Sequence, residues 1–382
     1  MLGRVARVAL VIGLVGVTVG AAAPGVLAAA QTYTVNVDGQ PPTGEPWAFL
    51  HFFPNTQLSV HQGDVIDFAF AATDTPHTAT LTPSADPEAW RSTNQGTGGP
   101  FETEVPDSAT GGDDQSVVLN PSVGFPSDPT CGTSGNPCSF GGSNVVNSGV
   151  QFPNPAAQPS FFVAVNAPVG TYSFLCLLHP GMEVPLNVVA SGTAVPSPDE
   201  VSATAAKQLK KATNTDGKTA DAIAQTVKIV HTTTGDIYKV HAGGFSNNVS
   251  ANEYPDKPVK VHTGDQIRFI GMPEIHTATF PKSSVKDPAN ALIQMFCEQP
   301  GADTPAQSPA DCSDPTKFEL VFNPAVLAPT KKLTLNDPKA FRNSGLLVPG
   351  VVASFVAKKP GTYTFVCLVH GPEMASKIKV VG

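Results

Sequence analysis

Two short segments of the chain combine a cysteine, a histidine and a methionine at close spacing. The first is "CLLHPGM" at 176–182, and the second is "CLVHGPEM" at 367–374. Thiolate sulfur, imidazole nitrogen and thioether sulfur together form a soft set of metal donors. One Cys-x-x-His segment alone would be weak evidence, because a buried histidine near a cysteine is more often structural. Two segments with the same residue types point to a metal site in each.

Each segment supplies one imidazole, and a second one must come from elsewhere in the chain. The block "HTAT" recurs at 77–80 and 276–279, which nominates its histidine in both copies. Two histidines and a cysteine with a weak axial methionine suit copper in electron transfer. Zinc is the alternative metal, although structural zinc sites prefer several thiolates. The expected ligands are His77, Cys176, His179 and Met182 in the first copy, and His276, Cys367, His370 and Met374 in the second.

The axial position differs between the two copies. Met182 lies three residues after its histidine, whereas Glu373 has that place in the second copy and Met374 follows one residue later. We prefer Met374 as the axial ligand, which requires the loop to bulge by one residue. If the loop instead keeps the path of the first copy, the Glu373 carboxylate faces the metal, favours Cu(II) and lowers the potential. In either case the two sites need not have equal potentials.

The two segments belong to an internal duplication with a period of about 200 residues. Five blocks recur in the same order, and each copy should therefore be a domain of its own. The matching pairs are "VHQGDVIDFAF" with "VHTGDQIRFIG", "HTATLTPS" with "HTATFPKS", "VVLNPSV" with "LVFNPAV", "NSGVQFP" with "NSGLLVP", and "GTYSFLCLLH" with "GTYTFVCLVH". We predict domain 1 at 31–192, a partly helical linker at 193–226, and domain 2 at 227–382.

The elements that would position these ligands are β-strands. Runs such as "VIDFAF" (65–70) alternate large apolar residues with smaller ones, and the 37 prolines and 34 glycines favour short strands joined by turns. Alternation places Cys176 on the same strand face as Tyr172 and Phe174, which should face the core. We therefore predict an all-β fold with two antiparallel sheets packed as a sandwich in each domain.

One helix is clearly indicated between the domains. Ser197 can serve as N-cap, Pro198 suits the first helical position, and Glu200 completes a capping box. We interpret this segment as a short helical linker.

The six cysteines divide by position into two local pairs and two that remain. Cys131 and Cys138 can close one loop, and Cys297 and Cys312 can close another, so we predict two disulfides. Cys176 and Cys367 are left at matching strand ends. A disulfide between these two is the alternative to metal binding, but it would leave the nearby histidines unexplained.

The first thirty residues resemble a signal peptide, with Arg4 and Arg7 before an apolar run and small residues at Ala28 and Ala30. An uncleaved membrane anchor is the alternative. No other stretch is apolar enough to span a bilayer. Cleavage would make the formal charge of −8 two units more negative, which argues against nucleic acid as a partner. We expect a periplasmic or secreted protein without a membrane span after cleavage.

The repeated "GTYxFxCxxH" with methionine beyond it, the upstream histidine and the "GD" strand resemble the cupredoxins, the blue copper family, in both copies. That resemblance implies an eight-stranded Greek-key sandwich in each domain. It also implies a type 1 copper that shuttles one electron, with the ligand roles given above. The first histidine lies unusually far before the cysteine, so each copy carries a long insertion.

Tandem cupredoxin domains also resemble copper nitrite reductases and two-domain laccases. Those enzymes hold further copper through His-x-His pairs or a histidine directly before the ligand cysteine. No two of the 9 histidines are separated by one residue, and Leu175 and Val366 precede the cysteines. We therefore predict that the chain is not an enzyme but an electron carrier with two type 1 copper sites and unidentified redox partner proteins. A copper storage or delivery protein and a copper oxidase or reductase are the alternatives.

Overall fold

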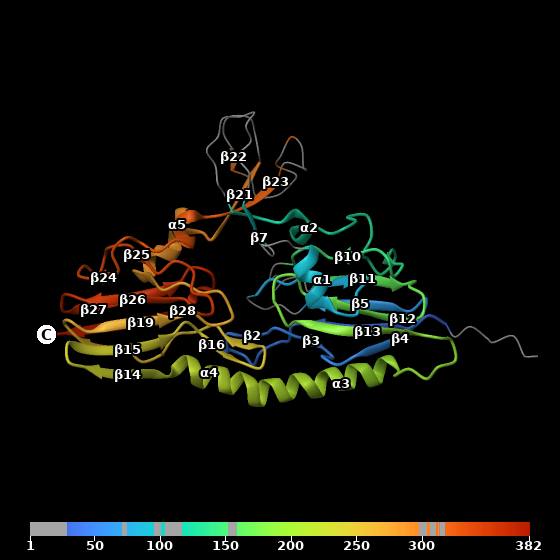
Figure 1. Ribbon diagram of the computed structural model, residues 1–382, viewed down its shortest axis with the longest axis horizontal. Coiled ribbons are helices and arrows are strands. Elements are labelled where there is room, and N and C mark those ends of the chain that lie inside the picture. Colours follow the sequence, from blue (N-terminus) through green and yellow to red (C-terminus); the bar gives the residue numbers. More distant parts are fainter. Residues whose placement is uncertain are drawn as a thin grey trace, which may run out of the picture.

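The computed structural model describes residues 29–70, 75–94, 101–103, 117–151, 159–297, 304–305, 311, 313 and 318–382. Two β-sandwiches lie side by side along the long axis, and a long helical segment runs beneath both (Figure 1). The predicted signal peptide falls almost entirely outside the described residues. In the described part of the chain, no helix has the length and apolar character needed to cross a bilayer.

Domain 1 is formed by two five-stranded sheets. The first sheet has the order β3-β1-β5-β11-β9, and the second has the order β10-β6-β12-β13-β4. Their bounds are β3 Phe52–Phe53, β1 Thr32–Val37, β5 Val65–Phe70, β11 Ser160–Val165, β9 Cys138–Phe140, β10 Val146–Asn147, β6 Thr80–Thr82, β12 Gly170–Leu175, β13 Glu183–Val189 and β4 Leu58–His61.

Domain 2 repeats this architecture, with the orders β14-β15-β19-β26-β24 and β18-β28-β27-β20-β25. The duplication seen in the sequence is therefore a duplication of the fold. The bounds are β14 Val227–Thr232, β15 Gly235–His241, β19 Gln266–Ile270, β26 Val352–Ala357, β24 Thr334–Leu335, β18 Val259–His262, β28 Gly371–Val381, β27 Gly361–Cys367, β20 Thr279–Phe280 and β25 Arg342–Asn343.

The all-β sandwich is confirmed, but the prediction of antiparallel sheets was wrong in part. β1 runs parallel to β5 and β13 runs parallel to β4 in domain 1. β15 with β19 and β18 with β28 repeat the same pairings in domain 2. Alternating residues reveal which face of a strand is buried, but not which strand a long crossover brings beside it. Short strands also raise each domain above the eight strands that the resemblance implies.

Interlocking aromatic rings fill the core of each sandwich. In domain 1, the rings of Phe52 and Phe68 both meet Phe174 edge to face, with centroids 5.0 and 5.2 Å away. Cys176 and Tyr172 belong to the same buried cluster, which confirms the face predicted from the alternation. The core thus ends at the cysteine and fixes its position.

The helical segment is longer and more buried than the predicted linker. It consists of α3 (Pro198–Lys211), a π-helical turn η1 (Ala212–Gly217) and α4 (Lys218–Gln225), and the predicted capping box of Ser197 and Glu200 is present. Val201 reaches the core of domain 1. Short helices that the sequence analysis did not predict are α1 (Pro87–Asn94), α2 (Pro121–Gly124), α5 (Pro324–Leu327), η2 (Lys282–Lys286) and η3 (Pro288–Asn290).

Two sheets join the domains. β2 (Trp47–Phe49) of domain 1 pairs with β17 (Val249–Ala251) of domain 2, which pairs with β16 (Gly244–Ser246). The long insertions build the other sheet, in the order β22-β21-β23-β8-β7, which stands above the junction in Figure 1. Its bounds are β22 Thr304–Pro305, β21 Ile293–Cys297, β23 Phe318–Phe322, β8 Val117–Leu119 and β7 Phe101–Thr103. The insertions therefore connect the two copies.

The cysteines divide as predicted where the structure describes them. Cys131 and Cys138 form a disulfide, with Cα atoms 4.9 Å apart. Cys297 is disulfide-bonded, and its predicted partner Cys312 lies outside the described residues. Cys176 and Cys367 are free and buried, so the alternative disulfide between them is not present.

Candidate metal centres

The expected donors of domain 1 converge at one end of the sandwich. His77 precedes β6, whereas Cys176 and His179 follow β12. The Nδ1 atoms of the two histidines are 3.2 Å apart. Cys176 Sγ lies 3.8 Å from His77 Nδ1 and 3.4 Å from His179 Nδ1. Both imidazoles therefore present the same ring nitrogen to the thiol.

Domain 2 repeats this geometry with its own residues. His276 Nδ1 and His370 Nδ1 are 3.2 Å apart, and Cys367 Sγ lies 4.0 and 3.6 Å from them. In each copy the first histidine and the cysteine are buried, and the last histidine is half-buried. The two copies have thus kept the same three-donor arrangement.

These separations fit a bound metal ion. Metal–nitrogen bonds of ~2.0 Å and metal–sulfur bonds of ~2.3 Å at trigonal angles place the donor atoms about 3.5 Å from one another. The measured distances scatter around that value in both clusters. A compact set of two imidazoles and one thiolate suits copper.

The predicted axial methionines are buried in the same core clusters as the cysteines. Met182 is fully buried in the core cluster that contains Cys176, and Met374 is fully buried with Cys367. The register between β27 and β28 shifts after Val366, so the segment just before Ala375 bulges. Within this bulge Glu373 is exposed to solvent. The preference for Met374 as the axial ligand stays a prediction.

A threonine next to each first histidine positions the cysteine, and the sequence analysis assigned no role to it. Thr78 N–H donates to Cys176 Sγ at 3.4 Å, and Thr78 Oγ1 accepts the N–H of Leu177 at 2.8 Å. Thr277 makes the same two contacts with Cys367 and Leu368, at 3.3 and 2.9 Å. The repeated "HTAT" block was the sequence feature from which the role of this threonine could have been inferred.

The repeated "NSG" block supports the histidine strand from the other side. Ser148 Oγ accepts the N–H of Ala79 at 2.9 Å, and Asn147 accepts the hydroxyl of Thr80 at 2.8 Å. Gly149 has φ of 66°, and a Cβ there would lie 2.6 Å from the nitrogen of Pro126, so only glycine fits. The corresponding residues of domain 2, Asn343, Ser344 and Gly345, make equivalent contacts.

The cysteines are prepared to be thiolates. Burial raises the pKa of Cys176, but the charges and hydrogen bonds of His179 and His77 together outweigh burial and bring the pKa well below its ordinary value. Burial also raises the pKa of Cys367, and hydrogen bonds with His276 and His370 lower it well below that value. Because the thiolate is the form that binds metal, both sites favour metal uptake near neutral pH.

The two centres differ in what contacts Nε2 of the first histidine, the ring nitrogen that faces away from the cysteine. In domain 1, Asp38 Oδ2 lies 3.0 Å from His77 Nε2. Gly243 has the equivalent backbone position in domain 2, and His276 Nε2 is buried without a hydrogen-bond partner among the described residues. Burial lowers the pKa of both imidazoles. In His77, Asp38 and Cys176 together outweigh burial and raise the pKa, whereas the pKa of His276 stays lowered.

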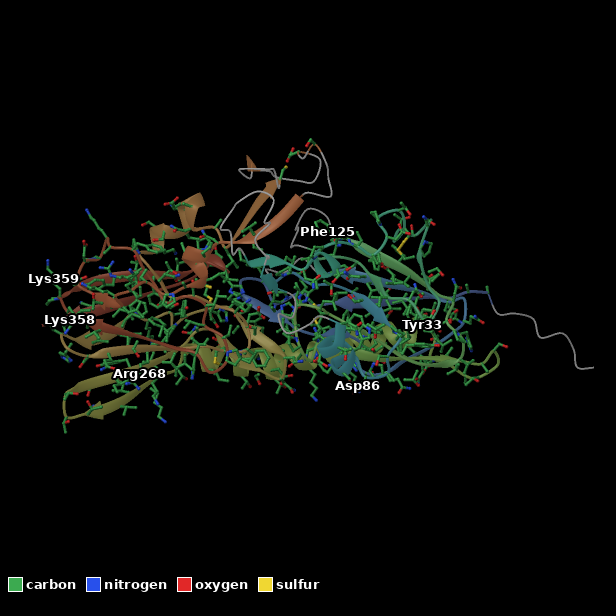
Figure 2. All side chains as sticks on the ribbon, turned by 45° about the horizontal axis from the view of Figure 1, so that its top comes forward. Tyr33, Asp86, Phe125, Arg268, Lys358 and Lys359 are labelled. Carbon is green, nitrogen blue, oxygen red and sulfur yellow. A yellow bond between two sulfur atoms is a disulfide. The ribbon has the colours of Figure 1, made fainter. Side chains whose placement is uncertain are left out.

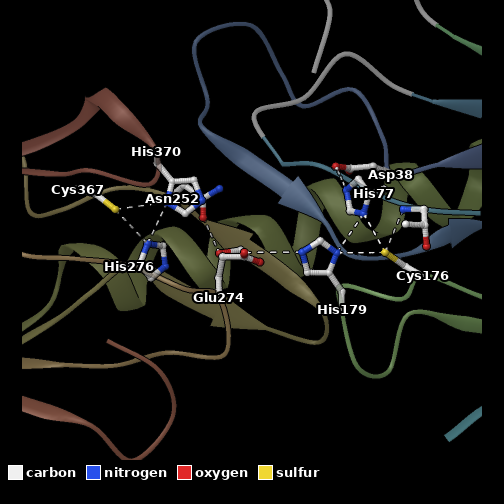
Figure 3. A network of polar contacts seen from close by, with 11 residues as sticks. Asp38, His77, Cys176, His179, Asn252, Glu274, His276, Cys367 and His370 are labelled. Atoms are coloured by element: carbon white, nitrogen blue, oxygen red, sulfur yellow. Dashed lines mark hydrogen bonds and ion pairs between the residues drawn. The ribbon is translucent and has the colours of Figure 1, made fainter. Parts of the chain in front are cut away.

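Glu274 lies between the two centres (Figure 3). It belongs to domain 2, two residues before His276, yet its Oε1 atom is 3.8 Å from Nε2 of His179 in domain 1. Burial raises the pKa of Glu274, but His179 together with His370 and His276 outweighs burial and lowers the pKa to about 2. Conversely, burial lowers the pKa of His179, while Cys176 and Glu274 raise it to about 10. No repeat or motif marked Asp38 or Glu274.

The other repeated histidines do not form a third centre. His61 Nε2 hydrogen-bonds to the carbonyl of Thr193 at 2.9 Å, and the side chain of His262 is 66% exposed beside Asp265. Within the described ranges, only the two clusters above bring three potential ligand residues together.

Comparisons with known proteins found similarity among solved structures. No protein-family model matches the chain, and no curated protein matches it. Among solved structures, auracyanin from the photosynthetic bacterium Roseiflexus castenholzii matches with 17% identity and a TM-score of 0.23, over 42% of this chain and 99% of that one. That crystal structure is of the dithionite-reduced protein.

Two other similar structures extend over most of the chain. A blue copper oxidase from Nitrosomonas europaea has 12% identity and a TM-score of 0.18, over 92% of this chain and 86% of that one. A copper-containing nitrite reductase from Thermus scotoductus SA-01 has 13% identity and a TM-score of 0.20, over 92% and 68%. These matches contradict the sequence-based prediction that the chain is not an enzyme, because the similar proteins include enzymes.

Proposed function

We propose that this protein of two cupredoxin-type domains is an exported electron-transfer protein that binds one type 1 copper ion in each domain. The observation that carries the proposal is the repeated cluster of two histidines and one cysteine at the end of a closed apolar core. Bound copper supplies a one-electron couple between Cu(I) and Cu(II).

The chain contributes a rigid donor set. His77, Cys176 and His179 would hold the ion in domain 1, with Met182 as the weak axial donor. His276, Cys367 and His370 would do the same in domain 2, with Met374 axial. Backbone hydrogen bonds to both cysteines restrain the sulfur atoms. A site that is already arranged needs little reorganisation when the electron arrives or leaves.

Export is part of the proposal. Besides the predicted signal peptide, the disulfide between Cys131 and Cys138 supports it, because disulfides persist mainly in oxidising compartments. The partners would be soluble redox proteins that exchange one electron at a time.

The test is copper stoichiometry with visible absorption and electron paramagnetic resonance on the mature protein and on Cys176→Ser and Cys367→Ser. We expect two copper ions and an intense thiolate-to-copper band, half of which disappears in each variant. Two weakly bound ions without that band, readily lost to a chelator, would instead indicate copper delivery. One copper ion lost only in Cys176→Ser would remove domain 2 from the proposal.

A further inference from the structure

The two centres are held close to each other by the fold rather than by a flexible linker. β2 of domain 1 pairs with β17 of domain 2, and Leu50 N–H donates to the carbonyl of Asn248 at 2.8 Å beside this pairing. The shared insertion sheet adds a second connection. The clusters therefore have a fixed relation, and the last histidine of domain 1 faces domain 2 instead of solvent.

That histidine is contacted by a carboxylate from the other domain. The side chain of His179 is 11% exposed, that of Glu274 is 7% exposed, and their closest atoms are 3.8 Å apart. Two residues after Glu274 comes His276, the first ligand of domain 2. A short covalent path therefore leads from the contact on His179 to the second centre.

The imidazoles of the two centres have different outer partners. In domain 1, His77 meets the carboxylate of Asp38 and His179 meets that of Glu274. In domain 2, a Cβ at Gly243 would lie 2.7 Å from His276 Nε2, so no side chain fits there, and this nitrogen has no partner in the described part of the chain.

A carboxylate that accepts a hydrogen bond from a ligand histidine makes the histidine a stronger donor. A stronger donor stabilises Cu(II) relative to Cu(I), which lowers the reduction potential of that centre. Asp38 lies within hydrogen-bond distance of His77, at 3.0 Å, whereas Nε2 of His276 has no such partner in the described part of the chain. Domain 1 should therefore have the lower potential.

We propose, on the basis of the function proposed above, that the two centres form a directed pair in which one electron passes from the centre of domain 1 to that of domain 2 across the contact of His179 with Glu274. In this step the copper of domain 1 is oxidised from Cu(I) to Cu(II), and that of domain 2 is reduced from Cu(II) to Cu(I). No proton or ligand leaves either centre. The one-electron donor protein would reduce domain 1, and the acceptor would oxidise domain 2.

The first experiment measures both potentials, assigned with the single-site variants Cys176→Ser and Cys367→Ser, in the native protein and in Asp38→Asn. Asp38 Oδ1 also accepts the N–H of Phe49 at 2.7 Å, and its φ is 66°. Asparagine keeps that acceptor and tolerates that backbone conformation, but it removes the carboxylate oxygen facing His77.

We expect the native domain 1 potential to lie below that of domain 2, and Asp38→Asn to raise only the former. A tenfold loss in the preference for Cu(II) over Cu(I) corresponds to 59 mV for a one-electron couple. The matched control is Asp86→Asn, the same charge change on the surface of domain 1, with the oxygen that caps α1 retained. A lower potential in domain 2, or equal shifts in both variants, would overturn the proposal.

The second experiment follows the electron. The native protein is reduced rapidly by a pulse of reductant in less than the stoichiometric amount. The absorption band of domain 1 should bleach first. It should then recover at the same rate at which the band of domain 2 bleaches. Glu274→Ala, which opens a space beside His179, should slow this exchange, whereas Glu373→Gln at the exposed bulge should not. Unequal potentials without electron transfer between the centres would overturn the transfer step. Absence of the thiolate-to-copper band from the native protein would instead overturn the proposed function itself.

Discussion

The donor residues of each centre are set by a few local contacts. Cys176 and Cys367 end core strands, and the N–H of the threonine after the first histidine points at the sulfur of each. The residue whose local structure differs between the copies is the methionine that we predict as the axial donor. Met182 comes directly from a tight turn, in which its N–H donates to the carbonyl of His179 at 3.1 Å, whereas Met374 comes from a bulged strand.

Replacing Met374 with leucine should raise the potential of the domain 2 centre. The thioether sulfur donates weakly to Cu(II), and leucine conserves the volume but donates nothing. The potential should rise by about 59 mV for every tenfold loss of Cu(II) affinity relative to Cu(I) affinity. Redox titration of Cys176→Ser with and without Met374→Leu measures this shift.

Glu373→Gln is the control for that substitution. Its side chain is exposed, so the potential should stay the same. If Glu373→Gln moved the potential and Met374→Leu did not, the carboxylate would be the axial ligand after all.

At the scale of elements, β2 is the strand on which the junction of the domains depends. It leaves domain 1 and pairs with β17, and the helical segment covers both. Phe49 on β2 is fully buried in this cluster with Trp47, Val249 and Ala220.

Phe49→Ala should therefore weaken the connection between the domains. Removal of a buried phenylalanine ring costs about 3–5 kcal/mol of folding free energy. Because Phe49 packs against residues of domain 2, we expect the single unfolding transition in denaturant to split into two. Ile229→Ala, at a 46% exposed position on β14, should change the stability by less than about 0.5 kcal/mol. One cooperative transition with an unchanged midpoint in Phe49→Ala would show that β2 does not couple the domains.

For the whole molecule, the charge is divided unequally between the two copies. Arg91 is the only Lys or Arg residue in 31–192, against fourteen Asp and Glu residues, whereas 227–382 contains sixteen Lys and Arg residues against thirteen acidic ones. Figure 2 shows Arg268, Lys358 and Lys359 toward the end of domain 2 that is remote from domain 1, and Asp86 on domain 1. The net charge of the whole chain concealed this division.

Domain 1 should therefore react faster with positively charged reductants. A cation such as hexaammineruthenium(II) is attracted to the acidic domain, and this attraction weakens as added salt shortens the Debye length from about 30 Å at 0.01 M to about 10 Å at 0.1 M. Stopped-flow reduction of Cys367→Ser, which keeps the domain 1 centre, should slow more steeply with salt than that of Cys176→Ser. Equal salt dependence in the two variants would mean that the unequal charge of the domains does not affect the rate at which the two centres are reduced.

The sequence alone determined the features that depend on neighbouring residues or on repetition. The spacing of Cys176 and His179, the recurrence of "HTAT" and the alternation in "GTYSFLC" located the clusters and the all-β fold, because a strand end and a short loop already bring such side chains together. The same information could not reveal the parallel strand pairs, and the absence of His-x-His pairs led to the prediction, now contradicted, that the chain is not an enzyme.

The contacts between the two copies could be learned from the three-dimensional fold alone. Asp38 is 39 residues from His77, and Glu274 approaches His179 from another domain, so neither contact leaves a local pattern. The sequence of the insertions likewise did not indicate their role, which is to join the domains through the pairing of β8 with β23. Contacts between distant segments depend on how whole sheets pack. The surroundings of the two matching donor sets therefore differ in ways that cannot be inferred from the sequence repeat.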